Sequence, residues 1–334
     1  MNELLNNCKN SDDNDEISLR PQKLNEYIGQ ENLKNNLRVF IGAAKKRNET
    51  LDHVLFYGPP GLGKTTLANI IANEMNSKII YVNGPSIEKS GDIASILTNL
   101  EPGDILFIDE IHRLPKVVEE ILYPAMEDFK LLITIPRDTG SSTLNIDLPP
   151  FTLIGATTRI GDLSSPLRAR FGIIEKINYY SIEELTTIVI RTARVFNISI
   201  DNKSAKEIAS RSRGTPRIAN RLFRRVRDFA EYNETNSISY KDCIKALKLL
   251  GIDEKGLDNV DMNYLLTLAT RFNGGPVGLD TLTSSIGEEN HNIEDVYEPY
   301  LIKNGFIDKT PRGRILTKKG YEHLKKYHKF DLKS

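Results

Sequence analysis

The segment Gly58-Pro-Pro-Gly-Leu-Gly-Lys-Thr65 decides the fold of this chain. A short apolar run at 53–57 precedes it and predicts a strand, while 65–76 follows with the apolar spacing of a helix. The segment satisfies the spacing G-x-x-x-x-G-K-S/T, which forms a phosphate-binding loop when it joins a strand to a helix. A glycine-rich turn that binds nothing does not account for the strand and helix on either side. The segment therefore predicts a P-loop.

The residue types of this loop suit a nucleoside triphosphate. Gly58, Gly61 and Gly63 let the backbone turn its N–H groups toward phosphate oxygens. The N-terminus of the following helix adds a dipole that favours anions. Lys64 is expected to reach the β- and γ-phosphates, and the Thr65 hydroxyl to ligate Mg²⁺.

A second apolar run, Ile105-Leu-Phe-Ile-Asp-Glu110, ends in two carboxylates. Its four apolar residues predict a buried strand, and ligands of parallel α/β sheets lie at the carboxyl ends of the strands. Asp109 is expected to hold Mg²⁺ directly or through water, and Glu110 to polarise the attacking water. A glutamate here favours ATP hydrolysis over a GTPase switch. We expect His112 to be a packed or solvated histidine.

Three more polar residues are candidates for contacts with a nucleotide bound at the loop. Thr158 ends an apolar run, where its hydroxyl can either sense the γ-phosphate or cap the strand end. Arg170 lies in Ser165–Gly172, and Arg217 begins a predicted helix. Read alone, both arginines fit solvated or ion-paired surface positions. Beside a P-loop, either one can neutralise charge that develops on the γ-phosphate.

The pattern of apolar residues predicts an α/β fold with three domains. Strands alternate with helices over 1–181, which indicates a parallel sheet covered on both faces, with an inserted hairpin at 129–148. The polar N-terminal segment, 1–16, is predicted to be disordered. Residues 182–252 are helical in period, and we expect no strands there. A third domain follows at 253–334, with paired β-like runs near its end.

Composition limits the class of protein. The 334 residues carry 45 basic and 45 acidic side chains, which excludes an indiscriminate polycation. The end of the chain, 302–334, nevertheless holds ten Lys and Arg against three Asp and Glu, so it is either a solvated face or a phosphate-binding one. No apolar run is long enough for a membrane helix. With two cysteines and no signal-peptide core, we expect a cytoplasmic protein.

Over about 17–325 the chain resembles the RuvB family, the bacterial Holliday-junction branch-migration ATPases of the AAA+ class. The resemblance rests on short strings spread along the chain: GPPGLGKTTLAN at 58–69, LFIDEIH at 106–112, LYPAMED at 122–128, LPPFTLIGATT at 148–158, SPLRARFG at 165–172, GTPRIAN at 214–220, GGPVGLD at 274–280, EPYLIKNG at 298–305 and TPRGR at 310–314. It implies an AAA+ P-loop ATPase domain, a helical lid domain and a C-terminal winged-helix DNA-binding domain.

The resemblance also implies roles for individual residues. The implied catalytic residues are Lys64, Asp109, Glu110, Thr158 as sensor 1, Arg170 as an arginine finger reaching a neighbouring subunit, and Arg217 as sensor 2. The implied nucleotide-binding residues are Leu19, Arg20, Gly61, Gly63, Lys64, Thr65, Thr66, Glu127, Asp128, Phe129, Arg170, Tyr180 and Arg217. Thr65 and Asp109 would hold Mg²⁺. Lys309, Arg312 and Arg314 would contact the DNA backbone from the wing.

The partners that the resemblance implies are ATP, duplex DNA at a Holliday junction, RuvA and, further, the RuvC resolvase. The chain would act as a homohexameric, ATP-dependent helicase or translocase in recombination, DNA repair and the SOS response, away from membranes. The hairpin would dock on RuvA, with 131–135 and 144–146 as its contact surface. Where the family has an arginine after Gly-Glu-Glu this chain has Asn290, so one DNA contact is expected to be absent or to move to His291.

Two other functions share part of this pattern. A clamp-loader-like ATPase would have the same loop, Asp-Glu pair and arginine motif, but the TPRGR segment argues against it. A nucleotide-gated binding module would use ATP only to assemble on DNA, and the sequence does not distinguish it from a motor.

Overall fold

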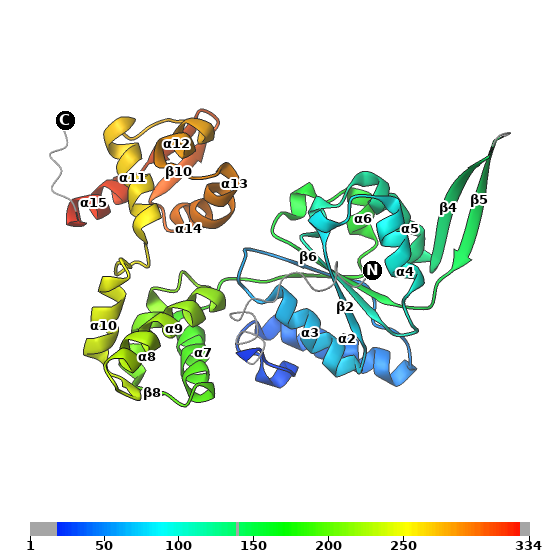
Figure 1. Ribbon diagram of the computed structural model, residues 1–334, viewed down its shortest axis with the longest axis horizontal. Coiled ribbons are helices and arrows are strands. Elements are labelled where there is room, and N and C mark those ends of the chain that lie inside the picture. The colour runs from blue at the N-terminus through cyan, green and yellow to red at the C-terminus, as the bar shows by residue number, and fades with distance from the viewer. Residues whose placement is uncertain (1–18, 138–139, 328–334) are drawn as a thin grey trace. The chain divides into compact units, whose positions relative to one another are not determined.

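The computed structural model describes residues 19–137 and 140–327, which form two compact units (Figure 1). The first unit runs to Gly58 and continues from Leu62 to Asn178. The second contains Pro59–Gly61, the tip of the predicted P-loop, and the chain from Tyr179 onward. The N-terminal segment predicted to be disordered, 1–16, lies outside the described residues.

The first unit is built on a five-stranded sheet in the order β2-β3-β6-β1-β7, in which all neighbouring strands are parallel. The strands are β1 (Val54–Tyr57), β2 (Ile79–Asn83), β3 (Ile105–Asp109), β6 (Thr152–Thr157) and β7 (Ile173–Lys176). Strand β6 is buried along its whole length, as expected for a strand covered on both faces. The predicted α/β fold is confirmed, and β7 is an additional strand.

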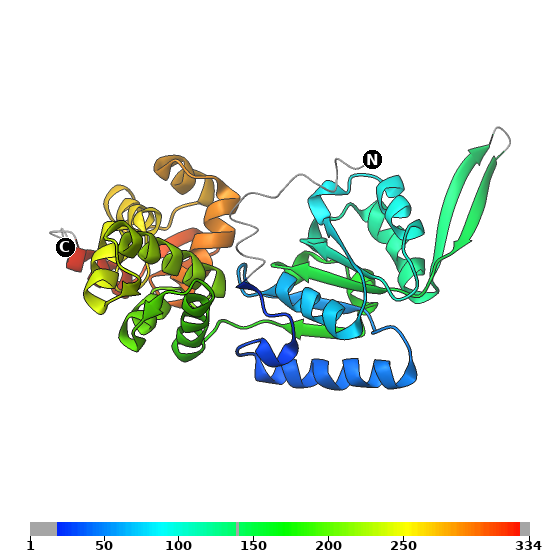
Figure 2. The same cartoon turned by 60° about the horizontal axis from the view of Figure 1, so that its bottom comes forward.

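Helices cover both faces of this sheet. Figures 1 and 2 show α2 and α3 on one face and α4, α5 and α6 on the other. The helices are α2 (Glu31–Arg47), α3 (Lys64–Met75), α4 (Ser90–Thr98), α5 (Lys116–Glu127) and α6 (Ser165–Ala169), with short 3₁₀ turns η1 (Leu24–Glu26), η2 (Gly84–Ser86), η3 (Ile111–Arg113) and η4 (Ile160–Asp162). Leu55, Leu106 and Phe151 are fully buried in the core between the layers.

The predicted hairpin is present as β4 (Lys130–Arg137) and β5 (Gly140–Asp147), an antiparallel pair that projects from the sheet (Figures 1 and 2). Leu131, at its base, is fully buried and belongs to the core, so it is not part of a contact surface. Leu132 and Leu144 are exposed instead, and they supply apolar surface on the hairpin.

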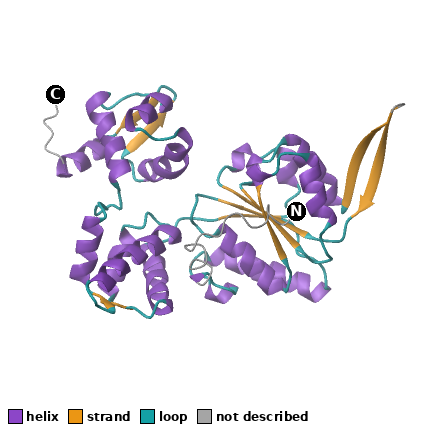
Figure 3. Cartoon of the chain, viewed as in Figure 1, coloured by secondary structure: helices purple, strands orange, loops and turns teal. Residues whose placement is uncertain are grey.

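The second unit begins with a helical part. Its helices are α7 (Ile182–Val195), α8 (Asn202–Ser210), α9 (Pro216–Tyr232) and α10 (Tyr240–Leu249). Contrary to the expectation of no strands, β8 (Ser199–Ile200) and β9 (Ser237–Ile238) pair in parallel between the helices (Figure 3). Two-residue strands are too short to give a period-2 signal in the sequence.

The rest of the second unit has the winged-helix arrangement. Its elements are α11 (Asn259–Arg271), α12 (Leu279–Ile286), α13 (Asn290–Asn292), the π-helical turn η5 (Ile293–Tyr297), α14 (Glu298–Lys303), β10 (Ile307–Thr310), β11 (Gly313–Leu316) and α15 (Lys318–Tyr327). Tyr264, Leu268 and Phe306 are buried in its core. The β10–β11 pair closes at Thr310 and Gly313, so Pro311 and Arg312 form the hairpin tip.

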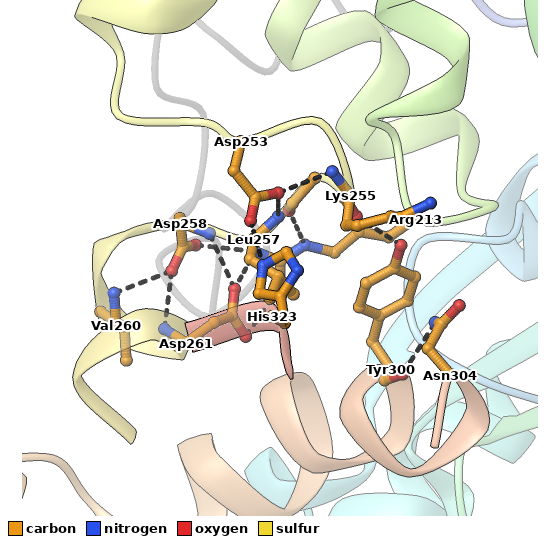
Figure 4. Close-up of polar contacts among 11 residues, drawn as sticks. Arg213, Asp253, Lys255, Leu257, Asp258, Val260, Asp261, Tyr300, Asn304 and His323 are labelled. Atoms are coloured by element: carbon orange, nitrogen blue, oxygen red, sulfur yellow. Dashed lines mark hydrogen bonds and ion pairs between the residues drawn. The ribbon is translucent and has the colours of Figure 1, made fainter. Parts of the chain in front are cut away.

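A buried arginine joins the helical part to the winged helix (Figure 4). The Arg213 Nη2 atom pairs with the carboxylate of Asp261, which is fully buried, and lies 3.1 Å from Asp258 Oδ2. The Nε of Arg213 donates to the Gly256 carbonyl at 2.7 Å, and the guanidinium carbon lies 5.4 Å from the centre of the Tyr300 ring. Because burial makes an unpaired charge costly, this set of partners fixes the junction.

A buried histidine makes the stability of the first unit depend on pH. His53 accepts the Leu153 N–H on Nδ1 at 2.9 Å, so its Nε2 carries the proton that faces the Met126 carbonyl at 3.0 Å. Burial lowers the pKa of His53 below its usual 6.5. The unfolded chain therefore binds this proton more readily than the native one, so stability is present above pH 6.5 and is lost as the pH falls.

We expect the free energy of unfolding of the full chain, measured in urea, to fall between pH 7.5 and pH 5.5. Because the unfolded imidazole takes up its proton near pH 6.5, His53 can contribute at most about 1.4 kcal/mol to this difference, however far burial lowers its native pKa. His53→Gln should be less stable at pH 7.5 but should lose less on acidification. An unchanged pH dependence in the variant would show that other groups cause it.

Candidate active site

The strand order brings three distant segments to one edge of the sheet. Strand β6 lies between β3 and β1, with Thr157 opposite Tyr57 and Gly155 opposite Ile108. All three strands are parallel, so the P-loop, Thr158 and the Asp109–Glu110 pair follow the same ends of neighbouring strands. This is the edge at which α/β sheets bind ligands.

The P-loop has a backbone that only glycine fits at two points. Gly58 has φ of +145°, and a Cβ there would lie 2.5 Å from the carbonyl oxygen of Ile177. Gly63 has φ of +101°, and a Cβ would lie 3.0 Å from the Tyr27 hydroxyl. That hydroxyl donates to the Leu62 carbonyl at 3.3 Å. Tyr27 therefore supports the loop, although it lies outside the P-loop pattern and the sequence did not single it out.

Lys64 begins α3 and is buried. Its ammonium group donates to the Gly58 carbonyl at 2.8 Å, which holds the charge across the loop. Gly63 precedes the helix and provides no side-chain cap for the first N–H groups. A phosphate bound at a helix N-terminus accepts hydrogen bonds from these N–H groups. Thr65 and Thr66 follow in the first turn, half-buried.

The two carboxylates at the end of β3 have different environments. The Asp109 Oδ1 atom accepts the backbone N–H of Glu110 at 3.0 Å. Glu110 has φ of +49°, an uncommon conformation for a residue with a side chain, and such strain costs about 1–3 kcal/mol and gathers at functional sites. The Thr158 hydroxyl donates to Glu110 Oε2 at 3.2 Å. Thr158 therefore contacts the catalytic candidate, which goes beyond capping a strand end.

The oxygen ligands at this edge fit Mg²⁺. A magnesium ion usually takes one or two protein oxygens and completes its shell with phosphate oxygens and water. The Thr65 hydroxyl and the Asp109 carboxylate are such oxygens. Among the described residues no group of three or more His, Cys, Asp or Glu side chains could hold a metal by itself.

Arg170 belongs to a second cluster in the first unit. Its Nη2 lies 3.1 Å from Glu127 Oε2, its Nη1 donates to the Pro166 carbonyl at 2.7 Å, and its guanidinium carbon lies 4.4 Å from the centre of the Tyr123 ring. Asp128, the residue after α5, is exposed. The structure thus brings together Arg170 and Glu127, two of the predicted nucleotide-binding residues.

The other members of the predicted nucleotide site divide between the units. Leu19 and Arg20 belong to the first unit, where Leu19 is buried and Arg20 half-buried. Phe129 also belongs there, and its ring packs edge-on against the Phe151 ring, with centroids 5.9 Å apart. Phe129 is half-buried, and its nucleotide contact stays a prediction.

Tyr180 and Arg217 belong to the second unit. The Tyr180 N–H donates to the Gly214 carbonyl at 2.9 Å, and Tyr180 is buried. The backbone N–H of Arg217 donates to the carbonyl of Gly61 at 3.3 Å. The sensor 2 candidate therefore begins its helix beside the tip of the P-loop.

The three predicted DNA contacts on the wing differ in their exposure. Arg312 is exposed at the hairpin tip, and Lys309 is exposed and lies 2.7 Å from Glu294 Oε1. Arg314 requires a correction, because it is buried and both its Nε and Nη2 donate to the Glu298 carboxylate, at 2.7 and 3.1 Å. Its charge is satisfied inside the domain, so we no longer count Arg314 among the DNA contacts.

Asn290 has a structural role in this chain. Its amide donates to Asp280 Oδ1, and its carbonyl oxygen accepts the Thr283 hydroxyl. These bonds tie the start of α13 to α12. His291, next in the chain, is exposed, with its Nε2 3.3 Å from Glu289 Oε2.

The fold and the site together define a class of protein. A P-loop between a buried strand and a helix, an Asp-Glu pair at the neighbouring strand end, a helical lid and a winged helix are the parts of an AAA+ ATPase that carries a DNA-binding domain. The chain belongs to the RuvB family. Family models match it as the P-loop domain of the Holliday junction DNA helicase RuvB at 19–177, the RuvB AAA lid domain at 180–253 and the RuvB C-terminal winged-helix domain at 254–325.

Solved structures agree with this assignment. A Thermotoga maritima structure, described as the RuvB Holliday junction branch migration motor, is 51% identical with a TM-score of 0.84. A mutant of Thermotoga maritima RuvB is 52% identical with a TM-score of 0.85. In both cases the match covers 92% of this chain and 98% of the other. Among the described residues, no helix is both long and apolar enough to span a membrane.

Proposed function

We propose that this chain is an ATP-driven motor that moves duplex DNA through a Holliday junction. The observation that carries the proposal is the Glu110 carboxylate, which accepts a hydrogen bond from Thr158, the first residue beyond the strand between β3 and β1. A DNA-binding protein that did not hydrolyse ATP would have no use for this carboxylate. The printed description of the Thermotoga relative as a branch migration motor supports the same conclusion.

The roles in hydrolysis follow from the charges and positions. Lys64 and the first N–H groups of α3 bind the β- and γ-phosphates. Thr65 and Asp109 hold Mg²⁺, which neutralises charge on the phosphates. Glu110 accepts a proton from the water that attacks the γ-phosphorus. Thr158 reports the presence of the γ-phosphate, and the resemblance gives Arg217 the same role.

The remaining nucleotide contacts are proposed from the family. Leu19, Arg20 and Tyr180 would surround the base and sugar, and Thr66 would complete the phosphate cradle. Arg170 would act on the site of a neighbouring subunit in a homohexamer, and its cluster with Glu127 supports this by placing the guanidinium beside another predicted nucleotide contact. The exposed Asp128 would lie at the same subunit boundary.

DNA contacts are proposed for the wing. Lys309 and Arg312 are exposed on or beside the β10–β11 tip, where long basic side chains reach phosphates. Such contacts position a protein without specifying a base, which suits a motor that must pass every sequence. The exposed Leu132 and Leu144 of the hairpin would dock on RuvA, and the complex would act with RuvC in cytoplasmic recombination and repair, including the SOS response.

A four-way-junction assay tests the motor directly. The full chain, supplied with RuvA, Mg²⁺ and ATP, should convert a synthetic junction into its two duplex products, and should not do so without ATP. Lys64→Ala should lower ATP affinity about a hundredfold, because it removes a charged hydrogen-bond donor, and should abolish conversion. Phosphate release without junction conversion would instead favour a nucleotide-gated binding module.

Mixed subunits test whether Arg170 acts on a neighbour. Arg170→Ala should bind ATP normally but lose about 10³–10⁵ in hydrolysis rate. Glu110→Gln should also be inactive. Because a ring that contains both variants has some interfaces with an intact Arg170 and an intact Glu110, mixing them should restore measurable phosphate release. No restoration at any mixing ratio would place the arginine in its own subunit's site.

The salt dependence of DNA binding tests the wing. Arg312→Ala should weaken binding equally for two unrelated duplex sequences and should reduce the slope of log affinity against log salt by about one. Arg225→Ala removes the same charge from α9, where its Nη1 lies 3.0 Å from Asp228 Oδ2, and serves as the control. Equal slopes for the wild type and Arg312→Ala would exclude a phosphate contact.

A further inference from the structure

His112 lies in contact with both the sensor strand and the catalytic candidate. It belongs to η3, which directly follows Glu110, and its side chain is only 10% exposed. Its Nδ1 atom lies 2.9 Å from Thr157 Oγ1 and 3.3 Å from Glu110 Oε2. His112 is thus packed, one of the two environments expected from the sequence, and one of its ring nitrogens faces two polar groups of the active-site edge.

The protonation state of His112 decides whether its Nδ1 atom donates or accepts a hydrogen bond. Burial lowers the pKa of His112, although Glu110 and Asp162 act to raise it and Arg159 and Arg113 act with burial, so the ring is neutral at pH 7 and carries one proton. A carboxylate oxygen only accepts hydrogen bonds. A proton on Nδ1 therefore allows donation to Glu110, whereas a bare Nδ1 would turn its lone pair toward the carboxylate. A proton on Nδ1 would lie nearest to Thr157 Oγ1, at 2.9 Å, with the Glu110 Oε2 atom beside it at 3.3 Å.

Thr157 has a partner that keeps it in place for this contact. The backbone N–H of Arg159 donates to Thr157 Oγ1 at 2.9 Å, and Thr157 is fully buried in β6. The imidazole thus lies against a fixed hydroxyl on one side and the carboxylate on the other. This arrangement restricts the ring, which in turn restricts the carboxylate.

Thr158 cannot hold Glu110 at every stage of the reaction. Its hydroxyl has one proton, which here is donated to Glu110 Oε2. A γ-phosphate offers only acceptor oxygens, so Thr158 must give that proton to the phosphate when it senses it. Glu110 then loses this hydrogen bond at the stage when its orientation matters most. His112 contacts the same oxygen and is anchored by Thr157, which does not depend on the phosphate.

We propose that His112 is the positioning residue that keeps Glu110 aligned while Thr158 is engaged with the γ-phosphate. Both contacts involve Oε2, which leaves Oε1 as the oxygen that accepts the proton of the attacking water. The proposal rests on the proposed ATPase function and names a residue that this function does not by itself require.

The test compares three side chains at position 112 in the full chain with Mg-ATP and duplex DNA. His112→Leu removes the donor, and kcat for phosphate release should fall about ten- to a hundredfold, the size expected for a misplaced catalytic group, while ATP affinity stays within about twofold. His112→Asn keeps a donor at the position of Nδ1 and should recover most of kcat. His112→Gln moves the donor outward and should resemble His112→Leu.

A double-mutant cycle separates positioning from a structural role. In single-turnover assays, adding His112→Leu to Glu110→Gln should cause little further loss, because the aligned carboxylate is already absent. A full additional loss, or a His112→Asn variant as slow as His112→Leu, would overturn the proposal. A wild-type chain that releases no phosphate would instead overturn the proposed function itself, so the two failures are distinguishable.

Discussion

The site depends on the position of β6 between β1 and β3. Because this strand separates the P-loop strand from the Asp-Glu strand, the first residue beyond β6 lies between the P-loop and the Asp109–Glu110 pair. Thr158 occupies that position and bonds to Glu110. Parallel pairing puts all three functional ends on the same side, so segments about fifty residues apart in sequence need no further element to assemble them.

The same edge concentrates backbone conformations that residues with a side chain rarely adopt. Gly58, Gly63 and Glu110 all have positive φ, and Glu110 adopts it with a side chain attached. The buried apolar residues of β1, β3 and β6 offset this cost, since they fix the strand ends on which the strained residues stand. The rigid sheet therefore holds Glu110 in its strained conformation at the edge.

The local motifs could be predicted from the sequence, and the contacts between distant residues could not. The P-loop, the buried strand before Asp109 and the helical region from 182 each follow from spacing within a few residues. Arg314 looked like its neighbour Arg312, but Arg314 lies on β11 and is buried against Glu298, whereas Arg312 lies in the exposed turn between the two strands. His112 gave no signal because its partner Thr157 lies 45 residues away and its significance depends on the pairing of β3 with β6.

The second unit adds a constraint on how nucleotide and DNA can be linked. Arg217, beside the P-loop tip, and Arg312, at the wing, belong to one compact unit. Arg213, four residues before Arg217, has its guanidinium buried between Asp258 and Asp261 of the winged helix. Separating these parts would leave a buried charge without its partner, which costs about 3–5 kcal/mol. The segment that leads into the helix of Arg217 is therefore held against the winged helix at this junction.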